Sequence, residues 1–352
     1  MSQGKSSRGS TGVARVLSKL NTSLENGNYY EAHQMYRTLY YRYSAQNKWP
    51  ELEAMLYDGA AKLFDHDQGG SGSDLAKLYL EILEKAEFKP TEEIMIKVGR
   101  LYQLTPSNLP DKENFKGQAL RWSMTVDKQH PNGHPRLHQL FAYDLWRCKK
   151  YAESRQHFLH SSDGSGCGIM LAEFHVSNGF PREMDLFLVG TVLQLLCLRK
   201  HLVAAITLKS YTDSHPSLQG DKKGPPYKHP LLNFVWLLLL AIEHKQSVSA
   251  YSTLVEKYRP SLKREPSYLE YLDKIGQHFF GLPPPPPRAR PGGMFSGIFE
   301  NLLNVLNDED EESGEDESEE ARSLPSGSRS SGKRNPRKSN GSATKMVTED
   351  LD

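Results

Sequence analysis

The sequence predicts an all-α protein, an alpha-solenoid in which antiparallel helix pairs stack side by side like tetratricopeptide repeats. Three observations lead to this fold class. Apolar residues recur at helical spacing along most of the chain up to about residue 280. The breaks between these runs are short, so consecutive helices become antiparallel neighbours. No stretch shows the sustained alternation of apolar and polar residues that marks a strand.

The first helix pair has the clearest pattern. Residues 13–26 form the first predicted helix, which Asn26-Gly27 ends with residues suited to a left-handed cap. Residues 29–46 form the second, and Arg37, Tyr41 and Ser44 lie opposite its apolar face. The apolar positions are Val13, Val16, Leu17, Leu20 and Leu24 in the first helix and Ala32, Met35, Tyr36, Leu39, Tyr40 and Tyr43 in the second.

The same pattern continues through the N-terminal half. Apolar residues from Leu52 to Phe64 mark a third helix, and the Gly-rich segment DQGGSGS at 67–73 predicts a loop. A fourth helix is marked by apolar residues from Leu75 to Leu83. Prolines then fall between the runs, where a helix can start or end. Four more helices are predicted, at residues 92–104, 111–125, 135–148 and 151–160.

A weak internal sequence similarity favours stacked repeats. The segment YYEAHQMY at 29–36 aligns with YAESRQHF at 151–158, and NKWPE at 47–51 is a fainter copy. The two longer segments share a leading Tyr, a Glu, a small residue, a Gln and a closing aromatic. Small residues let paired helices approach closely, as in tetratricopeptide units but without their strict period. Chance similarity among helix starts remains the alternative.

The C-terminal half is more apolar. Residues 183–200 and 230–243 are apolar on almost every side, so these helices are expected to be covered on more than one face. Between them, 216–230 is too rich in Gly and Pro for a helix and predicts a long excursion of the kind that often carries function. The run at 230–242 is shorter than the roughly 20 residues that span a bilayer, so we expect a buried helix and no direct membrane insertion.

The chain is expected to divide into four parts. Residues 1–11 are a disordered N-terminus, 12–160 the N-terminal half of the solenoid and 161–282 its C-terminal half. Residues 283–352 combine a Pro-rich spacer, a short amphipathic segment at 295–306, and an acidic and then basic tail that cannot bury a core. The amphipathic segment beyond a stiff spacer suggests a docking peptide.

Charge and cysteine content restrict the partners and the compartment. The 44 Lys and Arg nearly cancel the 43 Asp and Glu, so we expect no nucleic-acid partner. Cys148, Cys167 and Cys197 match neither a zinc knuckle nor a redox pair, which favours reduced thiols in the cytosol. The polar N-terminus lacks the apolar core of a signal peptide. The basic cluster at 333–338 is also compatible with nuclear import, and the sequence leaves that open.

No familiar catalytic motif occurs. There is no nucleophile elbow, P-loop, dinucleotide-binding glycine pattern or H-E-x-x-H. The Gly-rich segment at 164–170 follows no strand, so it predicts a helix start and no phosphate site. The pairs His134/His138 and His157/His160 lack a third ligand at helical spacing, and we interpret them as helix-surface histidines. We therefore expect no enzymatic activity, catalytic residue, cofactor or metal.

A first candidate surface, which we call the N-terminal stripe, lies on the first helix pair. Arg15 and Lys19 are one turn apart on the first helix, and Tyr30, Arg37 and Tyr41 form an outward row on the second. Tyrosine and arginine are the residue types that most often anchor protein interfaces. A solvated face is the alternative interpretation.

A second candidate surface lies on the helix at 230–243, which carries two apolar stripes. One solenoid neighbour covers only one stripe, so we expect the other to be exposed in the isolated chain and covered by a partner. The first stripe is Leu231, Phe234, Val235, Leu238 and Ile242, and the second is Leu232, Trp236 and Leu239.

Five segments of the chain closely resemble the Golgi-to-ER traffic protein four family: YYEAHQMYRTLYYRY, HPRLHQLFAYDLW, YAESRQHFLHSSDGSGC, PLLNFVWLLLLAIEH and SYLEYLDKIGQHFFG. The resemblance runs from about residue 13 to 282. It implies a scaffold without ATPase activity that serves the cytosolic pre-targeting of tail-anchored membrane proteins and the quality control of exposed hydrophobic segments. It implies three partners: a BAG-family quality-control chaperone, a ubiquitin-like-domain protein and a homodimeric ER-targeting ATPase.

The resemblance also assigns partners to the two surfaces. The N-terminal helix pairs would face the ATPase, so the N-terminal stripe becomes the expected ATPase-binding face. The C-terminal helices would hold the chaperone or the ubiquitin-like subunit, and we place that contact within residues 183–258. The alternative function is a helical-repeat assembly subunit of a degradation or translation complex, because solenoids serve there too. The expected contact residues are Leu231, Phe234, Val235, Trp236, Leu239 and Tyr227.

Overall fold

The computed structural model describes residues 6–218 and 224–284, with side chains from residue 15 onward. Contacts divide the chain into two units, Met1–Phe295 and Ser296–Asp352, and every described residue belongs to the first. Within these described ranges the chain forms fourteen α-helices and two 3₁₀-helices, and no strand. The predicted all-α class is therefore confirmed. Most of the spacer, the amphipathic segment and the charged tail lie outside the described residues.

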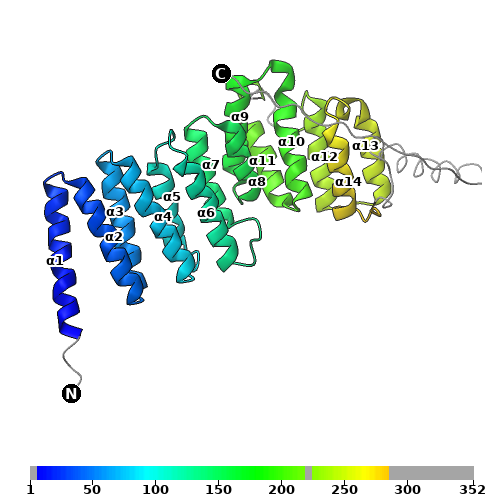
Figure 1. The fold of residues 1–352 in the computed structure, drawn as a ribbon. Coiled ribbons are helices and arrows are strands. Elements are labelled where there is room, and N and C mark those ends of the chain that lie inside the picture. Colours follow the sequence, from blue (N-terminus) through cyan, green and yellow to red (C-terminus); the bar gives the residue numbers. More distant parts are fainter. Residues whose placement is uncertain (1–5, 219–223, 285–352) are drawn as a thin grey trace, which may run out of the picture. The chain divides into compact units, whose positions relative to one another are not determined.

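The first eight helices stack in chain order (Figure 1). Most of these helices pack on the next one, as α1 on α2, α3 on α4 and α7 on α8. Contacts also join helices two apart, as α2 with α4, α3 with α5, α4 with α6 and α5 with α7. This is the two-layer arrangement expected for stacked antiparallel pairs. The helices are α1 Ser6–Glu25, α2 Tyr29–Ala45, α3 Trp49–Asp65, α4 Gly69–Lys85, α5 Glu92–Leu104, α6 Asp111–Val126, α7 Pro135–Arg147 and α8 Tyr151–His160.

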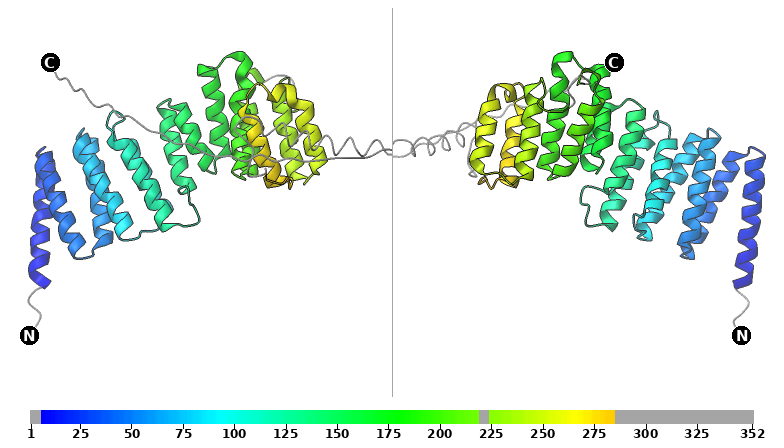
Figure 2. Two further views of the ribbon diagram at one scale, coloured as in Figure 1. Left: turned by 45° about the vertical axis from the view of Figure 1, so that its right-hand side comes forward. Right: turned by 180° about the vertical axis from the view of Figure 1, so that it is seen from behind.

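In the second half, the mostly apolar α10 lies at the centre. It contacts α8, α9, α11, α12 and α14, and the yellow helices lie beside the green ones in both views of Figure 2. This explains why a helix can be apolar on almost every side. The helices are α9 Gly164–Asn178, α10 Met184–Cys197, α11 His201–Ser214, α12 Pro230–Glu243, α13 Val248–Leu262 and α14 Ser267–Phe279, with 3₁₀-helices η1 Pro181–Glu183 and η2 Pro216–Leu218.

Seven of the helix ends share one backbone turn. The residue after the C-cap adopts a left-handed conformation, with φ between +49° and +74°. The amide of the following residue then bonds back to a carbonyl of the last turn, as Lys48 N does to Tyr43 O at 3.1 Å. Where the next helix begins directly after such a turn, as at Asn47 and Lys149, the chain reverses within three residues and the two helices pack as neighbours. The left-handed residues are Gly27, Asn47, Asp67, Glu87, Lys149, Arg199 and Lys245.

Two local predictions are wrong. Helix α1 begins at Ser6, so residues 6–11, which were expected to be disordered, are helical. Helix α4 begins at Gly69, so most of the predicted DQGGSGS loop is its first turns. Packing explains one of these glycines: a Cβ on Gly72 would lie 2.7 Å from Phe64 Cδ1, so only a residue without a side chain lets α4 approach α3 this closely.

The expected division between residues 160 and 161 falls in the turn between α8 and α9. Both sides of this turn belong to the same contact unit, and α8 also packs on α9 and α10. The ranges 12–160 and 161–282 therefore remain a sequence-based division of one helical stack.

Candidate partner-binding surfaces

The N-terminal stripe is largely solvent-exposed. Arg15 and Lys19 are exposed on α1, and Tyr30 and Tyr41 on α2 have 77% and 62% of their surface exposed. By contrast, Tyr36 on the apolar face of the same helix is only 3% exposed. Four of the five predicted residues are thus available to a partner.

Arg37, the fifth residue of the stripe, is paired with another residue of the chain. Its Nη1 lies 3.3 Å from Asp74 Oδ2 on α4, and His33 Nε2 lies 2.8 Å from the same oxygen. The Tyr41 hydroxyl and the Asp74 carboxylate both raise the pKa of the Arg37 guanidinium. Arg37 therefore ties α2 to α4 and orients Tyr41. The sequence pattern could not show this pairing, because 37 residues separate Arg37 from Asp74 and only the packing of α2 on α4 brings them together.

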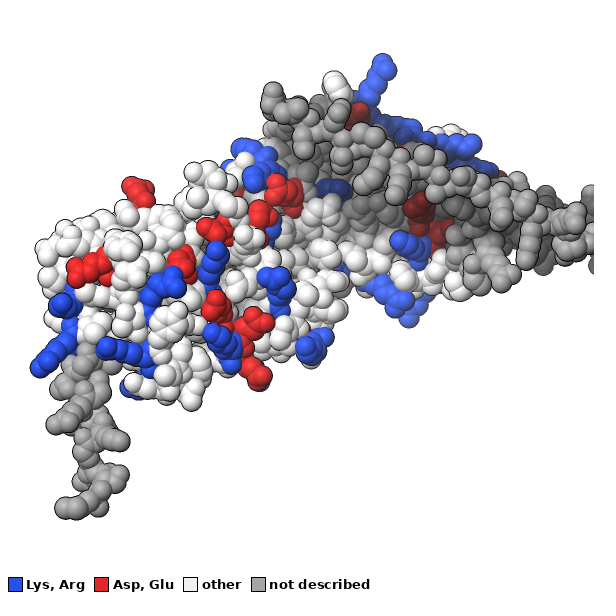
Figure 3. Space-filling model, in the orientation of Figure 1, with Lys and Arg blue, Asp and Glu red and all other residues white. Residues whose placement is uncertain are grey.

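Charges on the N-terminal helices do not gather by sign. On the face drawn in Figure 3, Lys and Arg are interspersed with Asp and Glu over these helices. A partner that recognises this face by charge must therefore contact individual residues and cannot rely on one broad potential.

A groove that the sequence did not predict lies beside α5 and α7. It has a volume of about 690 Å³, and its wall includes Ile96 and Tyr143, which are 48% and 42% exposed. At one end, Glu173 accepts hydrogen bonds from Trp146 Nε1 at 3.0 Å and from the Tyr151 hydroxyl at 2.7 Å. Ile96 and Tyr143 were visible in the sequence as apolar residues on the outward sides of their helices.

A buried ion pair lies below this groove. Lys112 Nζ and Asp144 Oδ2 are 2.8 Å apart, with side chains only 8% and 5% exposed. The Lys112 ammonium also lies 4.6 Å from the centre of the Tyr102 ring. Arg147 Nη2, which is exposed, donates to Asp144 Oδ1 at 2.7 Å. The pair joins α6 to α7 and supports the groove from beneath.

The predicted exposed stripe on α12 is wrong. Leu231, Phe234 and Val235 are fully buried, and Leu239 is only 9% exposed. On the second stripe Leu232 is also fully buried, because α10, α11 and α13 all pack on α12. Leu231, Phe234 and Val235 are therefore core residues of the chain and cannot contact a partner in this conformation.

Trp236 and Tyr227 remain accessible at the edge of this core. Both are half-buried and line a groove of about 330 Å³ between α11, α12 and residues 224–227. Asn233 fixes that segment: its Oδ1 accepts from Tyr227 N at 2.6 Å, and its Nδ2 donates to Tyr227 O at 2.7 Å. Of the six predicted contact residues, the structure brings Tyr227, Trp236 and Leu239 together at one groove.

The histidines are less exposed than predicted. His138 is only 4% exposed and its Nδ1 lies 3.0 Å from His157 Nδ1, while its Nε2 lies 2.8 Å from Asn132 O. Burial lowers the pKa of His138 to about 4 and that of His157 to about 3. The prediction of helix-surface histidines is therefore wrong for this pair, which joins α7 to α8 inside the stack.

Among the described residues, no helix is both long enough and apolar enough to cross a membrane.

Comparison with known proteins agrees with this fold. The family model for Golgi to ER traffic protein 4 matches residues 46–303. A Golgi to ER traffic protein 4 homolog from Oryzias latipes is 48% identical over 295 residues, covering 84% of this chain and 88% of its own. The Homo sapiens homolog is 45% identical over 306 residues, covering 87% and 90%.

A solved structure shares the fold at much lower identity. The crystal structure of C. therm. Get4 superimposes with a TM-score of 0.71 at 22% identity, covering 85% of this chain and 96% of that one. The matched family model and the close relatives both span most of the helical stack. This chain therefore belongs to the Golgi to ER traffic protein 4 family.

Proposed function

We propose that this protein is a non-enzymatic scaffold subunit of a cytosolic chaperone complex. It would deliver tail-anchored membrane proteins to the ER-targeting ATPase and take part in the quality control of exposed hydrophobic segments. Membership of the Golgi to ER traffic protein 4 family carries this proposal. A stack of helices with separate exposed surfaces suits a protein that holds partners side by side.

The N-terminal stripe is the proposed ATPase-binding face. Its two tyrosines combine a large apolar ring with a hydroxyl and are largely exposed to solvent, so they can serve as anchors for a partner. Arg15 and Lys19 supply positive charge on the neighbouring helix, where they can steer a partner of opposite charge. Because Asp74 holds Arg37, we assign Arg37 a positioning role for Tyr41.

The groove lined by Tyr227 and Trp236 is the proposed contact for the chaperone or the ubiquitin-like-domain subunit. It is concave, it combines aromatic and aliphatic walls, and Asn233 holds one of its sides in place. A groove of this kind accepts an apolar side chain or helix face from a partner. The core residues of α12 support it from beneath.

Affinity capture from cytosol tests the proposal. The tagged chain should copurify with a BAG-family chaperone, a ubiquitin-like-domain protein and the targeting ATPase. The variant Tyr30→Ser/Tyr41→Ser should lose the ATPase and keep the other two. Phe180→Ser is the matched control, because Phe180 is 71% exposed but lies outside both proposed surfaces. Capture of proteasome or ribosome subunits in place of these partners would contradict the proposal and favour an assembly subunit.

A further inference from the structure

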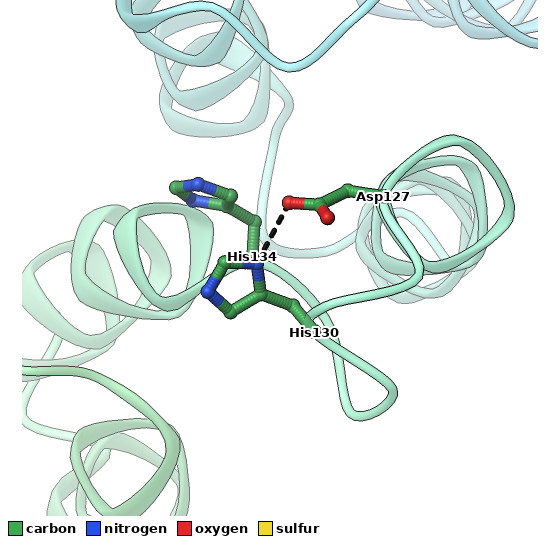
Figure 4. Close-up of side chains that lie close together, drawn as sticks. All are labelled: Asp127, His130 and His134. Carbon is green, nitrogen blue, oxygen red and sulfur yellow. Dashed lines mark hydrogen bonds and ion pairs between the residues drawn. The ribbon is translucent and has the colours of Figure 1, made fainter.

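Two histidines and one aspartate meet in the loop between α6 and α7. Asp127 follows α6, His134 precedes α7, and His130 lies between them (Figure 4). Asp127 Oδ2 lies 2.7 Å from His130 Nδ1, and the rings of His130 and His134 have centroids 4.7 Å apart. One ligand atom from each of the three residues lies within 4.8 Å of the other two.

The loop that carries these residues is fixed at several points. Its turn is closed by a bond from Gly133 N to His130 O at 3.0 Å. The amide of His134 donates to Ser123 Oγ on α6 at 3.1 Å. The ring of His138 on α7 bonds to Asn132 O at 2.8 Å. Because both flanking helices hold the loop, its three candidate ligands are already gathered before any ion binds.

We propose that Asp127, His130 and His134 bind a divalent transition-metal ion, with Zn²⁺ the best match. Two imidazoles and one carboxylate form a ligand set typical of zinc, whereas Mg²⁺ and Ca²⁺ prefer oxygen ligands alone. Three protein ligands leave a position for water or for a group from another molecule. Nothing in the proposed scaffold function requires this ion.

Binding would need only small movements. Zinc bonds of about 2.0–2.2 Å place tetrahedral ligand atoms about 3.4 Å apart. Ligand atoms that now lie up to 4.8 Å apart must therefore approach by up to about 1.4 Å, whereas Asp127 Oδ2 and His130 Nδ1, now 2.7 Å apart, must separate slightly. Rotation of the three side chains within the fixed loop can supply this. The ion would replace two existing interactions, the Asp127 to His130 hydrogen bond and the bond from Arg136 N to His134 Nδ1 at 3.2 Å. If those interactions only stabilise the loop, added zinc will not bind there.

Titration of the full chain with ZnCl₂ by calorimetry tests the site. The chain must lack a polyhistidine tag and carry Cys148→Ser, because Cys148 is an exposed thiol that can bind zinc itself. We expect one Zn²⁺ per chain. The dissociation constant for zinc should rise by roughly tenfold or more in His130→Asn and in His134→Asn. His244→Asn is the matched control, since His244 is an exposed histidine in the turn after α12. Equal affinity in wild type and the His130→Asn/His134→Asn double variant would overturn the proposal.

A second measurement covers the case in which these variants do not fold. Histidine ring resonances of the Cys148→Ser chain, followed by NMR during zinc addition, should shift first for His130 and His134. Shifts that begin at other histidines, or an absence of shifts up to about 1 mM zinc, would likewise overturn the proposal.

Discussion

Helix α12 offers a sharp test of which residues are core and which are surface. Phe234 is fully buried and its ring lies 5.5 Å from that of Tyr258 on α13. Trp236, two positions along the same helix, lines the groove and is half-buried. The two side chains are both large and aromatic, but the structure gives them different roles.

The variant Phe234→Ala should therefore lower the free energy of unfolding by about 3–5 kcal/mol, because it removes a buried ring and leaves a cavity beside Tyr258 on α13. At the usual dependence on denaturant this moves the urea midpoint by roughly 1–2 M. Trp236→Ala removes fewer buried contacts and should move the midpoint by well under half as much. Far-UV circular dichroism against urea measures both variants.

The comparison also separates stability from binding. Trp236→Asp should leave a folded, helical chain that no longer captures the chaperone or the ubiquitin-like subunit, because a carboxylate in the groove opposes an apolar contact. If Trp236→Ala destabilises the chain as much as Phe234→Ala, Trp236 belongs to the core and our assignment of the groove is wrong.

Three further predictions concern the interior. Burial lowers the pKa of His138 to about 4, so the unfolded chain binds more protons than the folded chain between about pH 6.5 and 4. The free energy of unfolding should therefore be highest above pH 6.5 and fall by roughly 3 kcal/mol as the pH drops to 4. The variant His138→Gln should flatten this part of a plot of urea midpoint against pH. Asp144→Ala leaves the Lys112 ammonium buried without its partner and should cost about 3–5 kcal/mol in urea unfolding, most of which Lys112→Met/Asp144→Leu should recover. Maleimide should label exposed Cys148 in the native chain, whereas Cys167, which is fully buried and has a raised thiol pKa, should react only after unfolding. If mass spectrometry detects the label on both cysteines of the native chain, the packing of α9 is contradicted.

Local pattern was sufficient for most helices and their order. The runs predicted at 92–104 and 151–160 coincide with α5 and α8, because their apolar spacing and flanking breaks are both local signals. The glycines at 69–72 misled the prediction because a glycine signals either a turn or a close helix contact. Only the position of Phe64 on the neighbouring helix decides between these, as the 2.7 Å approach at Gly72 shows.

The candidate surfaces depended more on contacts distant in sequence. The exposed tyrosines of α2 were predicted because they lie opposite an apolar face that a neighbour had to cover. The outcome for α12 could not be predicted in the same way, since three helices from different parts of the chain surround it. The pairing of Arg37 with Asp74, which are 37 residues apart, likewise requires the fold.

The most direct test of the scaffold proposal is whether one chain holds two partners at separate surfaces. Purified chain, targeting ATPase and ubiquitin-like subunit would be mixed and analysed by size-exclusion chromatography with light scattering. We expect a ternary complex, from which Arg15→Glu/Lys19→Glu loses only the ATPase at low salt and Trp236→Asp loses only the ubiquitin-like subunit. The charge reversal spares Arg37, because a glutamate there would repel Asp74 and disturb the fold. Displacement of one partner by the other, or ATPase binding unchanged in the charge-reversed variant, would contradict the account.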